Sequence, residues 1–221
     1  MQQPVKDAYL TIARPAEGLF RDRGSKFLAY AFPVKAEAEA LGKLEGLRQE
    51  HPKARHYCFA YRLGRDGTRF RANDDGEPGG TAGRPILGQI DRCRLTDIIV
   101  IVVRYFGGTK LGTSGLIQAY KTSAGAALDR AAIIEKTVKI RYRLRFGYER
   151  MGDVMRALER CGLSLQDQHF SDSAEVVIAI RKSEAAGKLT ELKALIAGVT
   201  LDEAAGLEAV DGVAINEEGT V

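Results

Sequence analysis

The chain has 221 residues, a formal net charge of +4, 45% hydrophobic residues and 28% charged residues, values typical of a soluble globular protein. Its longest strongly apolar run, residues 98–103, is far shorter than the roughly 20 residues that span a bilayer, and the first residues lack the apolar core of a signal peptide. The three cysteines are widely separated and form no CxxC pair, so the sequence supports neither a disulfide framework nor a zinc site and favours a reducing cytoplasm.

Charge is distributed unevenly along the chain. Residues 1–135 contain 21 Lys and Arg against 15 Asp and Glu, whereas residues 136–221 contain 12 against 14. A basic first part is typical of a protein that has an anionic partner, although an excess of this size also falls within ordinary scatter. We therefore keep both interpretations open at this point.

The hydrophobic pattern predicts an α+β chain with two domains, residues 1–135 and 136–221. In the first domain we expect strands at 5–14, 26–34, 56–63, 68–72 and 97–105, and helices at 35–51 and 113–132. Residues 98–103 are all β-branched, which predicts a strand buried on both faces.

The second domain shows the order βαββαβ, the ferredoxin-like arrangement. The expected strands are 138–147, 163–170, 174–181 and 207–215, and the expected helices are 149–161 and 183–197. This assignment leaves the tail after residue 215 outside the last strand.

Residues 74–88 (Asp-Asp-Gly-Glu-Pro-Gly-Gly-Thr-Ala-Gly-Arg-Pro-Ile-Leu-Gly) are the most informative segment. Their glycine and proline content predicts a shaped loop, because both residue types disfavour helices and central strands. Three roles are open to the carboxylates Asp74, Asp75 and Glu77. They could bond to their own backbone and anchor an arginine such as Arg84, contact a ligand or partner, or serve a metal site or acid–base catalysis.

A second glycine-rich segment, residues 105–115, links a strand to the start of a helix. Free backbone amides and the positive end of the helix dipole favour an anion there, and Lys110 adds a charge. The Walker A pattern is not met, because Thr113 stands where a lysine is required. The alternative is structural: glycines allow close packing, and Thr113 or Ser114 caps the helix.

We expect the two glycine-rich segments to lie side by side and to form one recognition surface. The residues expected to contact a ligand or partner there are Asp74, Asp75, Glu77, Thr81, Arg84, Arg104, Lys110, Gly112 and Ser114. Possible phosphate contacts on the preceding hairpin are Arg62, Arg65, Arg69 and Arg71, for which a solvated hairpin face is the alternative.

One further polar pair and two single histidines, His51 and His169, bear on the site. Strand alternation places His56 and Cys58 on one face, where a nucleophilic pair is conceivable but a structural role is favoured, because free cysteines are usually core residues. His51 and His169 are isolated in the sequence and support no site. We assign no catalytic residue and expect neither a metal nor a cofactor.

Three segments, residues 55–61, 73–87 and 102–112, resemble the IMPACT/YigZ family in order and spacing. The resemblance implies a two-layer α/β N-terminal domain similar to a small-subunit ribosomal protein and to a domain of elongation factor G. Residues 136–215 are similar to the small C-terminal domain of a bacterial member. The resemblance also implies a role in translation, since eukaryotic members restrain an activator of a kinase that senses amino-acid starvation.

Three hypotheses for function follow. The first is a non-catalytic, translation-associated regulator that binds RNA, the ribosome or a translation factor. The second is a phosphoryl-transfer or hydrolytic enzyme for a small phosphorylated substrate, with residues 107–115 holding phosphate and the carboxylates of the first segment holding Mg²⁺. The third is a protein-interaction module.

Overall fold

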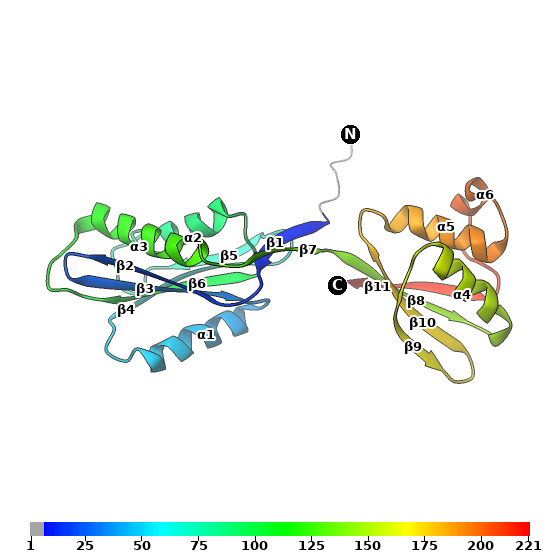
Figure 1. Cartoon of the computed structure of the whole chain (residues 1–221), viewed down its shortest axis with the longest axis horizontal. Coiled ribbons are helices and arrows are strands. Elements are labelled where there is room, and N and C mark those ends of the chain that lie inside the picture. The colour runs from blue at the N-terminus through cyan, green and yellow to red at the C-terminus, as the bar shows by residue number, and fades with distance from the viewer. Residues whose placement is uncertain (1–6) are drawn as a thin grey trace. The chain divides into compact units, whose positions relative to one another are not determined.

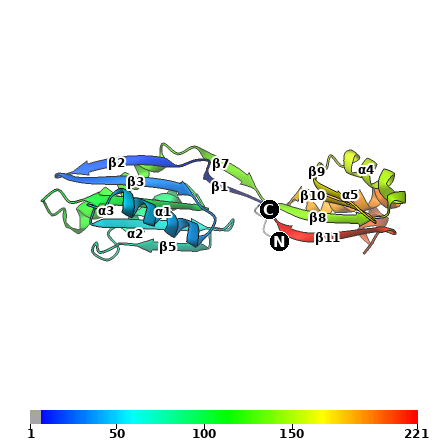
Figure 2. The same cartoon turned by 90° about the horizontal axis from the view of Figure 1, so that it is seen from below.

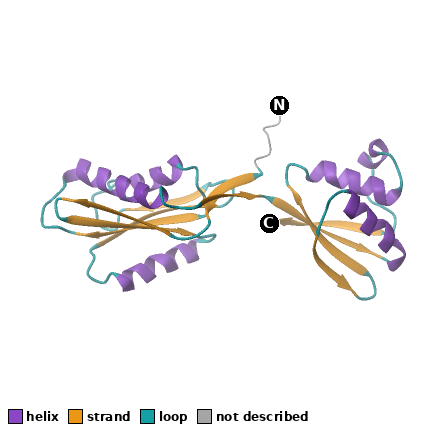
Figure 3. Ribbon diagram, viewed as in Figure 1, coloured by secondary structure: helices purple, strands orange, loops and turns teal. Residues whose placement is uncertain are grey.

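The structure is a computed structural model that describes residues 7–221, so Val5 and Lys6 of the first expected strand lie outside the described residues. The chain folds into two compact units, Ala8–Lys136 and Thr137–Val221, and the second also includes Asp7. We call them the N-terminal and C-terminal units and describe each by itself. Figures 1 and 3 show their helices and strands.

The N-terminal unit is built on a five-stranded antiparallel sheet in the order β2-β3-β6-β4-β5 (Figure 1). Its strands are β2 (Ala16–Asp22), β3 (Ser25–Pro33), β4 (His56–Leu63), β5 (Arg69–Asn73) and β6 (Ile98–Tyr105). Its helices are α1 (Glu37–Glu50), α2 (Gly83–Arg92) and α3 (Gly112–Leu128). Strands β1 (Ala8–Ile12) and β7 (Ile133–Thr137) form a separate two-stranded sheet.

Both faces of the central strand β6 are buried. The even-numbered residues from 98 to 102 pack in a core with α2 and α3, and the odd-numbered residues from 99 to 103 pack in a second core with α1. All six side chains are fully buried, which confirms the strand expected from the β-branched run. The α+β class is confirmed, with one correction. The N-terminal unit has three layers where two were expected, because helices cover apolar residues on both faces of the sheet (Figure 1).

Three elements of this unit were not predicted. Strands β2 and β7 were not expected, and residues 83–88, expected as loop, belong to helix α2. Proline is tolerated in α2 because Pro85 lies in the first turn, where its missing N–H has no helical acceptor. A glycine is required at the start of the helix, because a Cβ on Gly83 would lie 2.5 Å from the backbone nitrogen of Asn73.

The C-terminal unit has the expected βαββαβ order and a four-stranded antiparallel sheet, β11-β8-β10-β9. Its elements are β8 (Lys139–Phe146), the 3-10 helix η1 (Tyr148–Arg150), α4 (Met151–Arg160), β9 (Leu165–Phe170), β10 (Ala174–Arg181), α5 (Ala185–Ala197), α6 (Leu201–Ala205) and β11 (Val213–Thr220). Helices α4 and α5 cover one face (Figure 2). The last strand is shifted toward the C-terminus because residues 210–213 form a turn, in which the Val213 N–H donates to the Val210 carbonyl oxygen, so residues 216–220, expected outside the strand, belong to β11.

Candidate binding surface

Asp74 fixes the start of helix α2. Its Oδ2 accepts a hydrogen bond from the Gly80 N–H at 2.8 Å, and its Oδ1 accepts from the N–H groups of Ala82 at 2.9 Å and Gly83 at 2.8 Å. Burial opposes ionisation of this carboxyl, but the three N–H donors and the charge of Arg84 outweigh it and lower the pKa of Asp74. This carboxylate therefore acts as a helix cap.

Asp75 ties the same loop to two other elements. Strand β5 pairs only with residues 59–63 of β4, so the Tyr57 N–H lies beyond the end of that ladder. The Oδ2 of Asp75 accepts this N–H at 2.7 Å, and its Oδ1 lies 3.1 Å from Nη2 of Arg48 in α1. The Asp75 carbonyl oxygen also lies 2.9 Å from Nδ1 of His56. The second carboxylate thus anchors the loop to β4 and α1.

Glu77 is the buried carboxylate of the loop. Its Oε1 accepts hydrogen bonds from Nη1 of Arg104 at 2.6 Å and from the Tyr120 hydroxyl at 2.7 Å, and the two charged side chains are only 4% and 6% exposed. The Arg104 guanidinium also lies over the ring of Phe27, 5.3 Å from its centroid, and over the ring of Phe106 at 5.6 Å. Glu77 and Arg104 therefore form an ion pair that water hardly reaches.

Cys58 lies beside this ion pair. Its Sγ is 3.0 Å from the carbonyl oxygen of Asp74 and 3.3 Å from the Tyr120 hydroxyl. Burial raises the pKa of both the Cys58 thiol and the Tyr120 hydroxyl, and the nearby Glu77 carboxylate adds to both shifts. Both groups are therefore neutral at physiological pH and hold the core together.

These contacts bring the two glycine-rich segments together. Glu77 precedes α2 and bonds to Arg104, at the end of β6, and to Tyr120, in α3. At the far ends of the two helices, Arg92 and Asp129 form an ion pair of 2.9 Å, so both helices begin at the end of the sheet where β6 finishes. We call this end, with residues 74–84 and 106–114, the loop surface.

The loop surface is closely packed against the β2–β3 turn. A Cβ on Gly107 would lie 1.9 Å from the carbonyl carbon of Gly24, so only glycine fits there. The Gly107 N–H donates to Oγ of Ser25 at 3.2 Å, which holds the second segment in place. Gly107 thus allows tight backbone packing, as the structural alternative required, whereas Gly108 and Gly112 have open space around them and positive φ values of 89° and 72°.

The nine expected surface residues divide into two groups. The first group faces inward or makes internal bonds: Asp74, Asp75, Glu77 and Arg104, described above, and Thr81, which is buried with its Oγ1 donating to the Pro78 carbonyl oxygen at 2.7 Å. The second group is exposed and comprises Arg84, Lys110, Gly112 and Ser114. The expectation that Thr113 or Ser114 caps α3 was wrong, because the N-cap residue is Leu111 and the helix begins without a hydrogen bond from a capping side chain.

The hairpin arginines are engaged to different degrees. Arg62 donates to Asp91 Oδ1 through Nη2 at 2.6 Å and through Nε at 2.9 Å, and Arg71 pairs with Glu37 at 3.1 Å. Arg65 is half-buried. Its charge lowers the pKa of the Tyr9 hydroxyl, although burial of that hydroxyl has the larger effect and raises the pKa. Arg69 is exposed. Two of the four expected phosphate contacts are thus engaged in ion pairs within the unit.

Sequence reasoning missed a second polar cluster in this unit. His51, judged isolated from the sequence, has Nε2 2.8 Å from the Tyr30 hydroxyl and Nδ1 3.1 Å from the Tyr105 hydroxyl. Its carbonyl oxygen accepts a hydrogen bond from the Tyr57 hydroxyl at 2.6 Å. The expectation was wrong because these partners come from three different strands, and sequence spacing gives no sign of their meeting.

Among residues 7–221, no group of three or more His, Cys, Asp or Glu side chains is arranged to hold a metal ion. Within the same residues, no helix combines the length and the apolar character needed to cross a membrane.

Fold and site together define a class of two-unit α+β proteins in which an N-terminal sheet carries two glycine-rich segments at one end. The Impact N-terminal domain family matches residues 23–128. Similar proteins include IMPACT family member YvyE of Bacillus subtilis, 32% identical over 80% of this chain and 82% of the relative, and IMPACT family member YigZ of Escherichia coli, 31% identical over 86% and 93%. The chain belongs to the IMPACT family.

A solved structure supports the same fold. A crystal structure described only as that of a hypothetical protein is 30% identical in sequence and has a TM-score of 0.64. The match covers 84% of this chain and 91% of the other.

Proposed function

We propose that this chain is a non-catalytic, translation-associated regulator that binds RNA of the ribosome through the loop surface of the N-terminal unit. The observation that carries the proposal is the buried Glu77 carboxylate, which bonds to Arg104 and Tyr120 and so joins the two glycine-rich segments. The exposed cations Arg84 and Lys110 belong to these segments and supply charge for phosphate groups.

The contacts of the carboxylates support a binding role over a catalytic one. Asp74 caps α2, Asp75 holds the β4 backbone, and Glu77 neutralises a buried arginine, so each acid has a separate structural partner. A magnesium site needs oxygen ligands that converge on one point. The raised pKa of Cys58 likewise makes its thiol a poor nucleophile.

A role in translation is the one that the family resemblance implies. Three free cysteines suit a protein that acts in a reducing cytoplasm. A translation-regulatory protein is the other class of partner that the resemblance allows. Two properties of the binding distinguish RNA from such a protein. Binding to RNA phosphates weakens with salt because bound counterions are released, and digestion of the RNA abolishes it.

Sedimentation of the full chain with purified ribosomes tests the proposal. We expect association at 50 mM salt that weakens steeply toward 200 mM, and we expect the double variant Arg84→Gln/Lys110→Gln to bind more weakly and with a shallower salt dependence. Each lost phosphate contact lowers the log–log slope by about 0.7 on single strands or about 0.9 on duplex.

The double variant Lys35→Gln/Arg94→Gln is the matched control. It removes the same charge from two exposed residues that lie near the start of β6, at the opposite end of the sheet. Equal loss of binding in both double variants would contradict the assignment to the loop surface. Binding that survives ribonuclease would show a protein partner and contradict the RNA assignment.

A further inference from the structure

A row of cations follows strand β8 of the C-terminal unit. The sequence of β8 alternates strictly between basic and apolar residues. Its even-numbered residues, 140–146, pack in the core beneath α4 and α5. Its odd-numbered residues therefore lie on the opposite face, which the helices leave uncovered (Figure 2). They are Lys139, Arg141, Arg143 and Arg145.

Strand pairing defines the rest of this uncovered face. On β10, the residues that pair with the row are Glu175, Val177, Ala179 and Arg181. On β9, Asp167 pairs with Val177 and His169 pairs with Glu175, so both lie on the same face. Glu218 of β11 joins the face through its ion pairs. Five cations thus share the face with three carboxylates, and Arg181 also pairs with Asp7 at 2.7 Å. We call this surface the arginine face.

Two glutamates hold the row in a fixed arrangement. Glu218 lies 3.5 Å from Nε of Arg141 and also pairs with Nε of Arg143, while Glu175 lies 3.0 Å from Nη1 of Arg143 and 3.1 Å from Nε of Arg145. Arg141 and Arg145 therefore make these ion pairs through Nε. Their side chains are 37% and 63% exposed, so they remain accessible to solvent although they are held in place.

The composition of the face indicates the class of partner. Guanidinium groups bind phosphate through parallel hydrogen bonds, and alternate residues on a strand are roughly 6.6–6.8 Å apart, which makes a regular row of such donors. The apolar residues on the face are Val177, which is buried, Ala179, which is half-buried, and Ala214 of β11, which is exposed and pairs with Arg145, so the face offers no large apolar group for a lipid surface. Tyrosine, phenylalanine and tryptophan are absent from its named residues, and the one aromatic ring among them is that of His169 on the edge strand β9, so the face has no row of rings on which successive bases of a single strand would stack.

We infer that the arginine face binds the phosphate backbone of double-stranded RNA. Duplex RNA is recognised mostly through its shape, its 2′-hydroxyls and its phosphates, which suits a rigid cationic face whose named residues include a single aromatic ring, that of His169. The inference rests on the proposed function and extends it, because it places an RNA contact on the C-terminal unit in addition to the loop surface.

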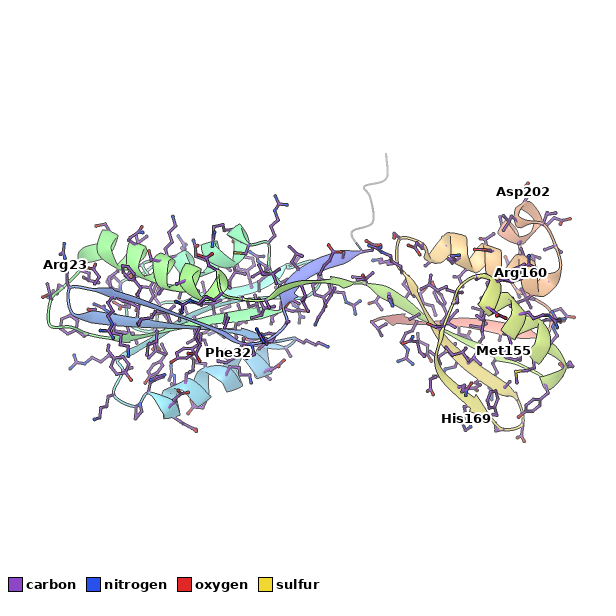
Figure 4. The ribbon with its side chains drawn as sticks, in the orientation of Figure 1. Arg23, Phe32, Met155, Arg160, His169 and Asp202 are labelled. Atoms are coloured by element: carbon purple, nitrogen blue, oxygen red, sulfur yellow. The ribbon has the colours of Figure 1, made fainter. Side chains whose placement is uncertain are left out.

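Fluorescence anisotropy with the full chain and a labelled 20-base-pair RNA duplex tests the inference. The variant Arg141→Gln/Arg145→Gln removes two cations and leaves both glutamates paired with Arg143. The matched control is Arg156→Gln/Arg160→Gln on α4, whose side chains belong to the helical layer (Figure 4 labels Arg160). A second variant, Lys139→Gln, removes an exposed cation of the row that has no part in these ion pairs.

We expect wild type and control to bind the duplex with the same salt dependence. Two lost phosphate contacts lower the log–log slope by about 1.8, so between 50 and 200 mM salt the affinity of the arginine-face variant should fall about 12-fold less than that of wild type. Lys139→Gln should lower the slope by about 0.9. A single-stranded RNA of equal length should bind more weakly than the duplex.

Three results would overturn the inference: equal slopes for wild type and the arginine-face variant, equal effects of the variant and its control, or no duplex binding by wild type. None of these results decides the proposed function, which depends on ribosome sedimentation and on Arg84 and Lys110. Loss of sedimentation with intact duplex binding would remove the proposed function and leave the arginine face as an RNA site.

Discussion

Removing the Glu77 carboxylate should destabilise the N-terminal unit more than any exposed ion pair does. The variant Glu77→Ala leaves the Arg104 guanidinium buried without its counter-charge and takes away the acceptor of the Tyr120 hydroxyl. Breaking one side of a buried ion pair costs about 3–5 kcal/mol. The exposed pair of Arg92 and Asp129, with side chains 52% and 67% exposed, should be worth about 0–1 kcal/mol when Asp129→Ala breaks it.

Urea unfolding of the N-terminal unit can be followed by alkylation of Cys58, which is buried in the native core and becomes reactive when the unit unfolds. The double variant Glu77→Leu/Arg104→Met should recover at least half of the lost stability, because an apolar pair carries no uncompensated charge. If Glu77→Ala lowers the free energy of unfolding no more than Asp129→Ala does, the buried ion pair does not hold the two segments together.

Three shorter predictions follow from the same unit. Asp74→Ala should lower the free energy of unfolding by about 0.5–2 kcal/mol at neutral pH. Because the pKa of Asp74 in the folded protein lies below its ordinary value of 3.8, the urea midpoints of wild type and variant should converge as the pH falls below that value. Gly83→Ala should destabilise the fold, since its Cβ would clash with the backbone of Asn73 at the end of β5, whereas Gly88→Ala in the same helix has open space and should stabilise by up to about 1 kcal/mol in thermal unfolding. At pH 7, a thiol reagent should modify half-buried Cys93 faster than Cys58, and equal rates would contradict the burial of the latter.

Much of the fold could be predicted from local patterns. The β-branched run at 98–103 predicted the central strand, and periodicity predicted the βαββαβ order of the C-terminal unit, because both patterns follow from burial of one or two faces. Helix α2 was missed because Gly83 and Pro85 disfavour helices in isolation. Its start depends instead on the Asp74 carboxylate and on close packing against β5, which are tertiary effects.

The candidate site was only partly predictable for a similar reason. The loops were recognisable from their glycines and charges, but the partners of Glu77 lie 27 and 43 residues away along the chain. Nothing in the local sequence distinguishes a carboxylate that enters the core from one that stays in solvent. Exposed Arg84 and Lys110 therefore remain as candidates for contact, while the acids beside them proved to have internal partners.

Net charge summed over a segment does not show how the charge is divided between the two faces of a sheet. Residues 136–221 carry more acids than bases and were not expected to meet an anionic partner. A sheet, however, sends alternate residues to opposite faces, so the basic residues of β8 gather on one side while Asp153, Glu159 and Glu191 lie on helices. The alternation in residues 139–146 was visible in the sequence. For a strand with one buried face, the charge of the other face is the quantity that bears on binding.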